Sequence, residues 1–96
     1  MARRRYLVTY DIADDKRRVR VMHTLRDHGD RLQFSVFRCD LNAREVQQLK
    51  QTLHTLIHHK DDQTLIIDLG PVDGANGDGI ESIGRTYQAE ARSRII

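Results

Sequence analysis

The residues best suited to chemistry are one aspartate and several arginines near the start of the chain. Residues 5–12 are rich in Tyr, Val and Leu without helical spacing, which predicts a strand, and Asp11 stands near its carboxyl end. Open α/β sheets usually bind ligands at that end, so a carboxylate there indicates a site. The alternative is that Asp11 caps the next helix, a task that Asp14 and Asp15 already fill.

A magnesium site at this position would need more than one carboxylate. Mg²⁺ prefers octahedral oxygen ligands and usually takes one or two carboxylates together with waters and phosphates. Two copies of Asp11 that face each other across a twofold axis would meet that need. The hypothesis therefore requires a homodimer that shares one ion.

Four cations, Lys16, Arg17, Arg18 and Arg20, crowd the first turns of the predicted helix that follows. The positive end of the helix dipole disfavours cations there, so an anion should compensate. Asp14 and Asp15 are one source of negative charge, and a bound phosphate backbone is the other. The residue types leave both explanations open.

Aromatic and histidine side chains offer further candidates. Tyr10 and Phe37 could stack on nucleic-acid bases, although both are more often core residues. His54 and His58 lie four residues apart on a predicted helix, but no third zinc ligand matches them. We interpret these histidines as solvated, and the lone Cys39 as a small buried hydrophobic residue.

The segments that position these residues alternate between strands and helices. A helix is expected from Asp14 or Asp15 to Gly29, with an apolar stripe of Val19, Val21, Met22 and Leu25. Residues 31–41 alternate as a strand whose phase slips near Ser35, which a bulge or a tight hairpin would explain. Asn42 starts a second helix, residues 64–70 form a last core strand, and residues 80–87 offer an extra strand. The order predicts a small sheet with both helices on one face.

Composition limits the class of protein. The chain has 96 residues, 39% hydrophobic and 31% charged, which predicts one soluble domain over residues 1–96 that gains stability from a second copy. No apolar stretch predicts a signal peptide or a membrane span, and the single cysteine favours a cytoplasmic location. Residues 1–31 hold nine Lys or Arg against five acids, which suggests a face for a polyanion. Ordinary solvated arginines are the alternative.

The motifs YDI, DDKRR-R and R-x-Q-x-SVF-x-x-x-L, in this order, resemble the CRISPR-associated protein two family, the small subunit of the spacer-acquisition machinery. The resemblance covers about residues 5–70, and the remainder from residue 71 matches loosely. It implies an α+β, ferredoxin-like βαββαβ fold in which residues 31–41 form two strands. It also implies a homodimer whose last strand, residues 80–87 here, crosses to the partner.

The resemblance assigns roles to particular residues. Asp11 is implied as a Mg²⁺ ligand, with Mn²⁺ as a possible substitute, and Tyr10 precedes it in the catalytic position. The positions that the family associates with nucleic-acid contact or cleavage are Arg18, with Arg17 as its alternative, Arg20, Arg31 and Phe37.

The implied function is CRISPR adaptation by a homodimer that binds DNA or RNA, beside an integrase subunit. We expect a metal-dependent endonuclease, either an endoribonuclease or a deoxyribonuclease, with weak or gated activity. A non-catalytic adaptor that bridges integrase subunits is the first alternative; it needs Arg3 to Arg5, the arginines of the first predicted helix and the tail, but not Asp11. A toxin-like endoribonuclease of the same fold is the second.

Overall fold

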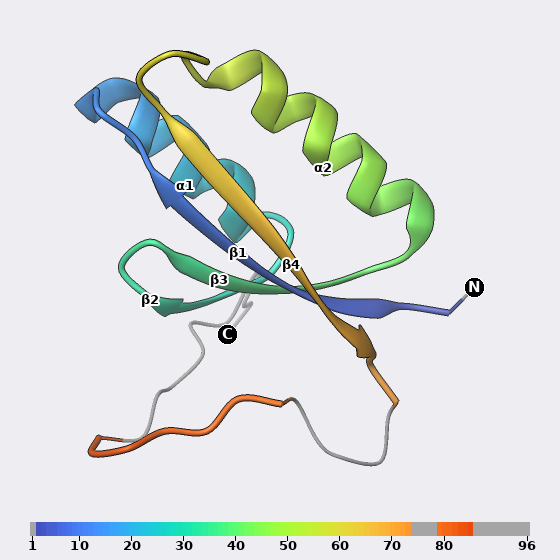
Figure 1. The fold of residues 1–96 in the computed structure, drawn as a ribbon. Helices are drawn as coiled ribbons and strands as arrows, with labels where there is room; N and C mark the ends of the chain where they lie inside the picture. The colour runs from blue at the N-terminus through green and yellow to red at the C-terminus, as the bar shows by residue number, and fades with distance from the viewer. Residues whose placement is uncertain (1, 74–78, 86–96) are drawn as a thin grey trace, which may run out of the picture.

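The computed structural model describes residues 2–73 and 79–85, and its core is one four-stranded antiparallel sheet covered by two helices. The elements follow the order β1 (Arg4–Asp11), α1 (Asp15–Arg26), β2 (Asp30–Gln33), β3 (Val36–Leu41), α2 (Ala43–Leu56) and β4 (Gln63–Pro71). In space the strands run β2-β3-β1-β4, and both helices lie on one face of the sheet (Figure 1). This arrangement confirms the predicted ferredoxin-like βαββαβ fold.

Side-chain caps fix the start of both helices. Asp14 is the N-cap of α1 and accepts a 2.9 Å hydrogen bond from the backbone N–H of Arg17, which lowers the pKa of this carboxyl. Asn42 and Glu45 form a capping box on α2, with reciprocal bonds of 2.8 and 2.9 Å. The predicted caps are confirmed, and Asp11 has no part in them.

The phase slip near Ser35 is a tight hairpin. Strands β2 and β3 are joined through Phe34 and Ser35, and Gln33 pairs with Val36 across the turn. The side chains of β3 then alternate cleanly, with Phe37, Cys39 and Leu41 buried. Two short strands therefore replace the single slipped strand that the alternation alone suggested.

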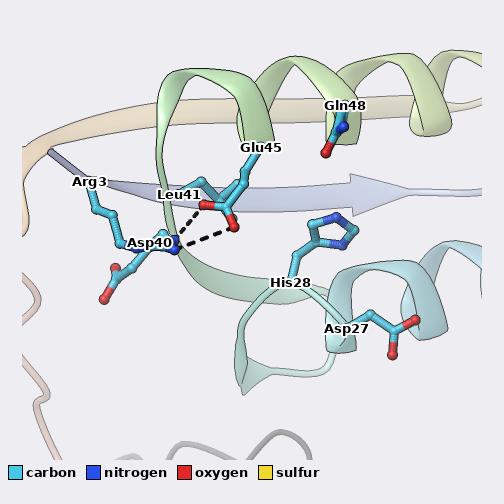
Figure 2. Close-up of a pocket in the computed structure, with 7 residues that line it drawn as sticks. All are labelled: Arg3, Asp27, His28, Asp40, Leu41, Glu45 and Gln48. Carbon is cyan, nitrogen blue, oxygen red and sulfur yellow. Dashed lines mark hydrogen bonds and ion pairs between the residues drawn. The ribbon is translucent and has the colours of Figure 1, made fainter. Parts of the chain in front are cut away.

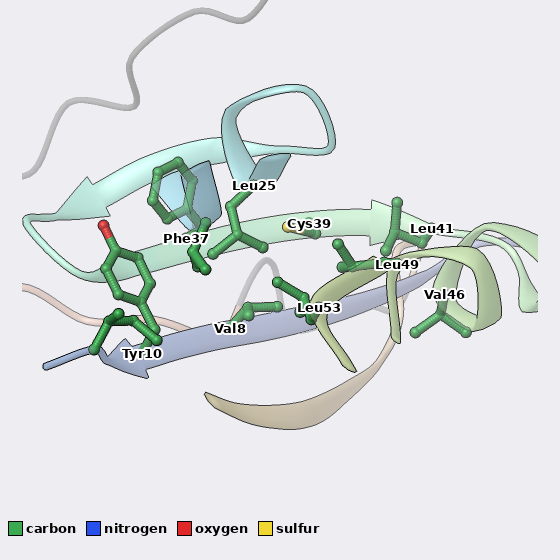
Figure 3. Packing of buried hydrophobic residues seen from close by; sticks show 11 residues of the cluster. Val8, Tyr10, Leu25, Phe37, Cys39, Leu41, Val46, Leu49 and Leu53 are labelled. Atoms are coloured by element: carbon green, nitrogen blue, oxygen red, sulfur yellow. The ribbon is translucent and has the colours of Figure 1, made fainter. Parts of the chain in front are cut away.

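The hydrophobic core lies between the sheet and the helices (Figure 3). Val8 and Tyr10 of β1 and Phe37 of β3 face α1 and α2 in this layer. Val21 and Leu25 of α1 are buried in the core. Val19 is exposed, so its predicted place in the apolar stripe is wrong. Helix α2 buries a regular stripe, formed by Val46, Leu49 and Leu53.

The face of the sheet opposite the helices is uncovered and partly apolar. Leu7 pairs with Ile67, and Thr9 with Leu65, so these four side chains share the outer face. Leu65 and Ile67 are 47% and 42% exposed. A large apolar surface of this kind is typical of an interaction site.

Residues 79–85 have no regular secondary structure in the single chain. The strand predicted over residues 80–87 would pair with a partner, and its last two residues lie outside the described part, so it stays a prediction. The tail after residue 87 also lies outside it. Over the described residues, neither helix has the length and apolar character to cross a membrane.

Candidate nucleic-acid and metal site

Asp11 ends β1 on the outer face of the sheet. Tyr10 points into the core, so the side chain of Asp11 points to the opposite side, level with Gln63 of β4. Its carboxylate is exposed and makes no hydrogen bond or ion pair with the described residues. Because Asp14 caps the helix, the capping explanation for Asp11 is wrong. The carboxylate is available to a ligand.

Tyr10 is a core residue. The residue is only 6% exposed, its ring packs 6.4 Å from the ring of Phe37, and its hydroxyl donates a 3.2 Å hydrogen bond to the Phe34 carbonyl. Burial raises the pKa of this hydroxyl, although the charges of neighbouring arginines oppose the shift. Tyr10 therefore holds the β2–β3 turn, and its catalytic role stays a prediction.

The aromatic side chain exposed at this end of the sheet is Phe34. Phe37 is fully buried, so its predicted role in contacting bases is wrong, because no face of its ring is accessible. Phe34 is 73% exposed, and the guanidinium of Arg31 lies 4.9 Å from the centre of its ring. The phase slip near Ser35 was the sequence signal that could have predicted the exposure of Phe34, because a turn presents its side chains to solvent.

Arg31 and Arg18 brace the backbone around Asp11. The Nε and Nη2 atoms of Arg31 donate to the Phe34 carbonyl at 3.1 and 2.8 Å. Arg18 donates to the carbonyl of Ile12, the residue after Asp11, at 3.3 and 3.2 Å, and pairs with Asp15 at 2.8 Å. Arg18 thus lies beside the backbone that follows Asp11, and Arg31 lies beside the β2–β3 turn; both come from the helix side of the sheet, opposite to the face to which the Asp11 carboxylate points.

Arg17 and Arg20 have different surroundings. Arg17 makes a two-pronged ion pair with Asp62 at 2.7 and 3.1 Å, so its guanidinium is engaged within the chain, and its predicted phosphate contact stays a prediction. Arg20 is exposed, and its side chain makes no hydrogen bond or ion pair with the described residues. Of the two alternatives Arg17 and Arg18, Arg18 is the one beside Asp11.

Asp62 joins the loop after β1 to the loop before β4. Its side chain is fully buried and also accepts hydrogen bonds from the backbone N–H groups of Ala13, at 2.9 Å, and His58, at 2.8 Å. The guanidinium of Arg17 is the main reason why the pKa of Asp62 lies far below its ordinary value. This network fixes the path of the chain just beyond Asp11.

Ion pairs also neutralise the arginines at the N-terminus. Arg3 pairs with Glu45, Arg4 with Asp68 at 2.9 Å, and Arg5 with Asp40 at 2.8 Å. The excess positive charge of residues 1–31 is thus partly balanced by acids from the rest of the chain. The basic surface expected at Arg3 to Arg5 is reduced accordingly.

A polar pocket of about 350 Å³ lies at the other end of the sheet (Figure 2). Arg3 and Glu45 pair across it, and the pKa of Glu45 is lowered chiefly by the N–H of Asn42. His28 points toward this space, with Nδ1 2.7 Å from the Thr24 carbonyl. The pocket is remote from Asp11 and from the arginines around it.

The structure supports the interpretation of these histidines as solvated, but the prediction that His54 and His58 share one helix is wrong, because α2 ends at Leu56 and His58 lies in the loop after it. His54 stacks on His59, with ring centres 4.3 Å apart, and the Nε2 atom of His59 lies 2.7 Å from the His54 carbonyl. Over residues 2–73 and 79–85, no three His, Cys, Asp or Glu side chains gather as metal ligands. One chain therefore contributes the single carboxylate of Asp11 at the end of β1.

Comparison with known proteins gives a consistent result. The sequence profile of the family described as CRISPR associated protein Cas2 matches residues 4–73. Among curated relatives, the CRISPR-associated endoribonuclease Cas2 of Geobacter sulfurreducens is 33% identical over 95% of both chains. The CRISPR-associated endoribonuclease Cas2 1 of Rhodospirillum rubrum is 35% identical over 95% of this chain and 88% of its own.

Solved structures share the fold. A hypothetical protein from Thermus thermophilus superposes with a TM-score of 0.75 at 35% identity, over 92% of this chain and 99% of its own. Streptococcus pyogenes Cas2 superposes with a TM-score of 0.71 at 31% identity, over 83% of this chain and 99% of its own. With the profile match over β1 to β4 and the aspartate that ends β1, these similarities show that the chain belongs to the CRISPR-associated Cas2 family.

Proposed function

We propose that the protein is a metal-dependent endonuclease of CRISPR adaptation, in which two chains each supply Asp11 to one Mg²⁺ or Mn²⁺ ion. The observation that carries the proposal is the exposed carboxylate of Asp11, which ends a central strand and has no partner among the described residues. A carboxylate that neither caps a helix nor pairs with an arginine is suited to a ligand from outside the chain. Carboxylate oxygens are the ligands that Mg²⁺ prefers.

The homodimer follows from the outer face of the sheet. Leu7, Leu65 and Ile67 form an apolar surface next to Asp11, and burying it against a second copy would be favourable. A twofold axis brings a residue to face its own copy only where that residue lies near the axis, so the proposal places the axis beside Asp11. The packing that buries Leu7, Leu65 and Ile67 would then bring the two Asp11 carboxylates together.

The roles of the side chains follow from their positions. A bound Mg²⁺ would polarise the scissile phosphoryl group and lower the pKa of an attacking water. Asp11 holds the ion, and its neighbouring backbone is fixed by Arg18 and by the Asp62 network. The exposed Arg20, and the part of Arg18 that remains exposed, would bind phosphates of the same strand.

The substrate that we propose is RNA, with DNA as the alternative. The relatives from Geobacter and Rhodospirillum are named endoribonucleases, which supports a ribonuclease. Arginine contacts to phosphate oxygens do not distinguish bases, so the described cations are compatible with both polymers. A panel of RNA and DNA oligonucleotides separates the two.

A non-catalytic adaptor that bridges integrase subunits is the second candidate function. It is favoured by one observation: among the described residues, no group of three or more His, Cys, Asp or Glu side chains gathers, so Asp11 does not belong to a cluster that would supply a general base. The pairing of Arg3 to Arg5 with acids of the same chain makes these arginines unsuitable as its main DNA contacts. An adaptor would therefore depend on Arg18 and Arg20.

Cleavage assays of wild type and Asp11→Asn test the nuclease. We expect cutting in Mg²⁺ or Mn²⁺, none in chelator, and loss of cutting in the variant while it remains a folded dimer. Asp61→Asn is the matched control, because Asp61 is an exposed carboxylate on the turn before β4. Metal-dependent cutting by pure Asp11→Asn would exclude the proposed site. Spacer acquisition at wild-type frequency in cells with this variant would favour the adaptor.

A further inference from the structure

Phe34 is a large apolar side chain that is 73% exposed at the tip of the β2–β3 hairpin. Exposing a phenylalanine ring to water is unfavourable, and the adjacent Phe37 shows that this segment can bury one completely. The ring also lies at the end of the sheet that carries Asp11, since the Phe34 carbonyl is bonded to Tyr10. The ring is therefore available to a ligand at this end of the sheet.

The hairpin holds this ring on a rigid support. The Phe34 carbonyl accepts hydrogen bonds from the Tyr10 hydroxyl, at 3.2 Å, and from two nitrogens of Arg31, at 3.1 and 2.8 Å. The next carbonyl, of Ser35, accepts a 3.1 Å bond from the backbone N–H of Tyr10. A turn fixed by four donated hydrogen bonds presents its side chain with little loss of backbone freedom on binding.

The surroundings of the ring are cationic. The Arg31 guanidinium lies 4.9 Å from the ring centre, in the range of a cation–π contact. An exposed ring with an arginine beside it combines the two features that bind an unpaired nucleotide, a stacking surface for the base and positive charge for the phosphate.

We propose that Phe34, backed by Arg31, is a stacking subsite for one unpaired base of the nucleic acid strand that passes Asp11. This inference rests on the proposed nuclease function and adds to it a preference for single-stranded segments, because a paired and stacked base cannot offer its face to a protruding ring. A ring with the Arg31 guanidinium against it is less suited to an apolar protein surface, since docking there would remove this cation from water.

Binding measured by fluorescence anisotropy in chelator tests the subsite without cleavage. The probes are an unstructured 12-nucleotide RNA and a perfect RNA duplex of the same length. Loss of one base stack in Phe34→Ala should weaken binding of the single strand about 5- to 150-fold. Binding of the duplex should change less than about 2-fold, because phosphate contacts dominate it. Phe34→Trp should retain the affinity and show quenched tryptophan emission on binding.

Gln47→Ala is the control, because Gln47 is an exposed residue of α2 outside the sheet face and the β2–β3 hairpin, and its removal should leave both affinities unchanged. Equal losses for the single strand and the duplex, or no loss for either, would overturn the subsite. Dissociation of the dimer by Phe34→Ala in sedimentation would overturn it too, since the ring would then be a subunit contact. The assay needs no metal, so failure of the Asp11 experiment and failure of this one are separate results.

Discussion

Replacing Tyr10 with phenylalanine separates a structural role from a catalytic one. The change removes the hydroxyl alone, so the packing of the ring against Phe37 remains. The Phe34 carbonyl loses one donor but keeps two from Arg31, so no buried acceptor is left unpaired. A neutral hydrogen bond contributes about 0.5–1.5 kcal/mol, and the remaining donors favour the lower half of that range.

We therefore expect Tyr10→Phe to lower the free energy of unfolding by about 0.5–1 kcal/mol, which corresponds to a Tm lower by about 2–8 °C for a domain of this size. Thermal unfolding followed by circular dichroism measures this. The rate of metal-dependent cleavage should stay within about 2-fold of wild type, because the hydroxyl is buried. Tyr6→Phe is the control, because the Tyr6 hydroxyl makes no hydrogen bond with the described residues and its loss should cost less.

The pH dependence gives a second check on Tyr10. Its pKa is raised by burial, so folding favours the protonated hydroxyl. The corresponding stability is complete below the pKa of the unfolded chain, about 10, and is lost as the pH rises through the higher folded value. This alkaline loss should be smaller in Tyr10→Phe. A cleavage rate reduced more than about 10-fold with an unchanged Tm would refute the structural assignment and restore a catalytic one.

Two further predictions concern the arginines of α1 and the Asp62 network. Asp62→Asn should lower the Tm by at least about 5 °C, because it breaks a buried ion pair, whereas Asp61→Asn should hardly change it. The folded pKa of Asp62 is depressed, so its contribution to stability is present above about pH 4–5 and is lost as the pH falls. The loss of stability on acid titration should therefore be larger in wild type than in Asp62→Asn. Arg20→Gln should weaken nucleic acid binding, reduce the slope of log K against log salt by about 1 and leave the Tm unchanged. Arg17→Gln should lower the Tm and leave nucleic acid binding and its salt slope unchanged. A reduced salt slope for Arg17→Gln would contradict its structural assignment.

Local patterns were sufficient to predict the order of elements. Capping side chains act over a few residues, so Asp14 and the pair of Asn42 and Glu45 marked the helix starts correctly. The slip of phase at Ser35 marked the hairpin, because strand side chains alternate and a turn resets the alternation. The register of the strands and the exposure of Val19 depend on contacts between distant segments, which the local pattern does not contain.

The candidate site was predicted only in part for the same reason. Asp11 lies as expected, because its place depends on one strand end. The ion pair of Arg17 was not predicted, because its partner, Asp62, is 45 residues away in sequence. Phe34 and Phe37 belong to opposite phases of one alternating stretch, and only the packing of β3 against the helices decides that Phe37 is buried and Phe34 exposed.

The most direct test of the central claim is the stoichiometry of metal binding. Titration of the dimer with Mn²⁺, followed by electron paramagnetic resonance of the free ion, should give one tight site per two chains, because each chain supplies one carboxylate. Asp11→Asn should lose this site and remain dimeric, while Asp61→Asn should keep it. One site per chain, or an unchanged tight site in dimeric Asp11→Asn, would contradict an ion shared between two copies of Asp11.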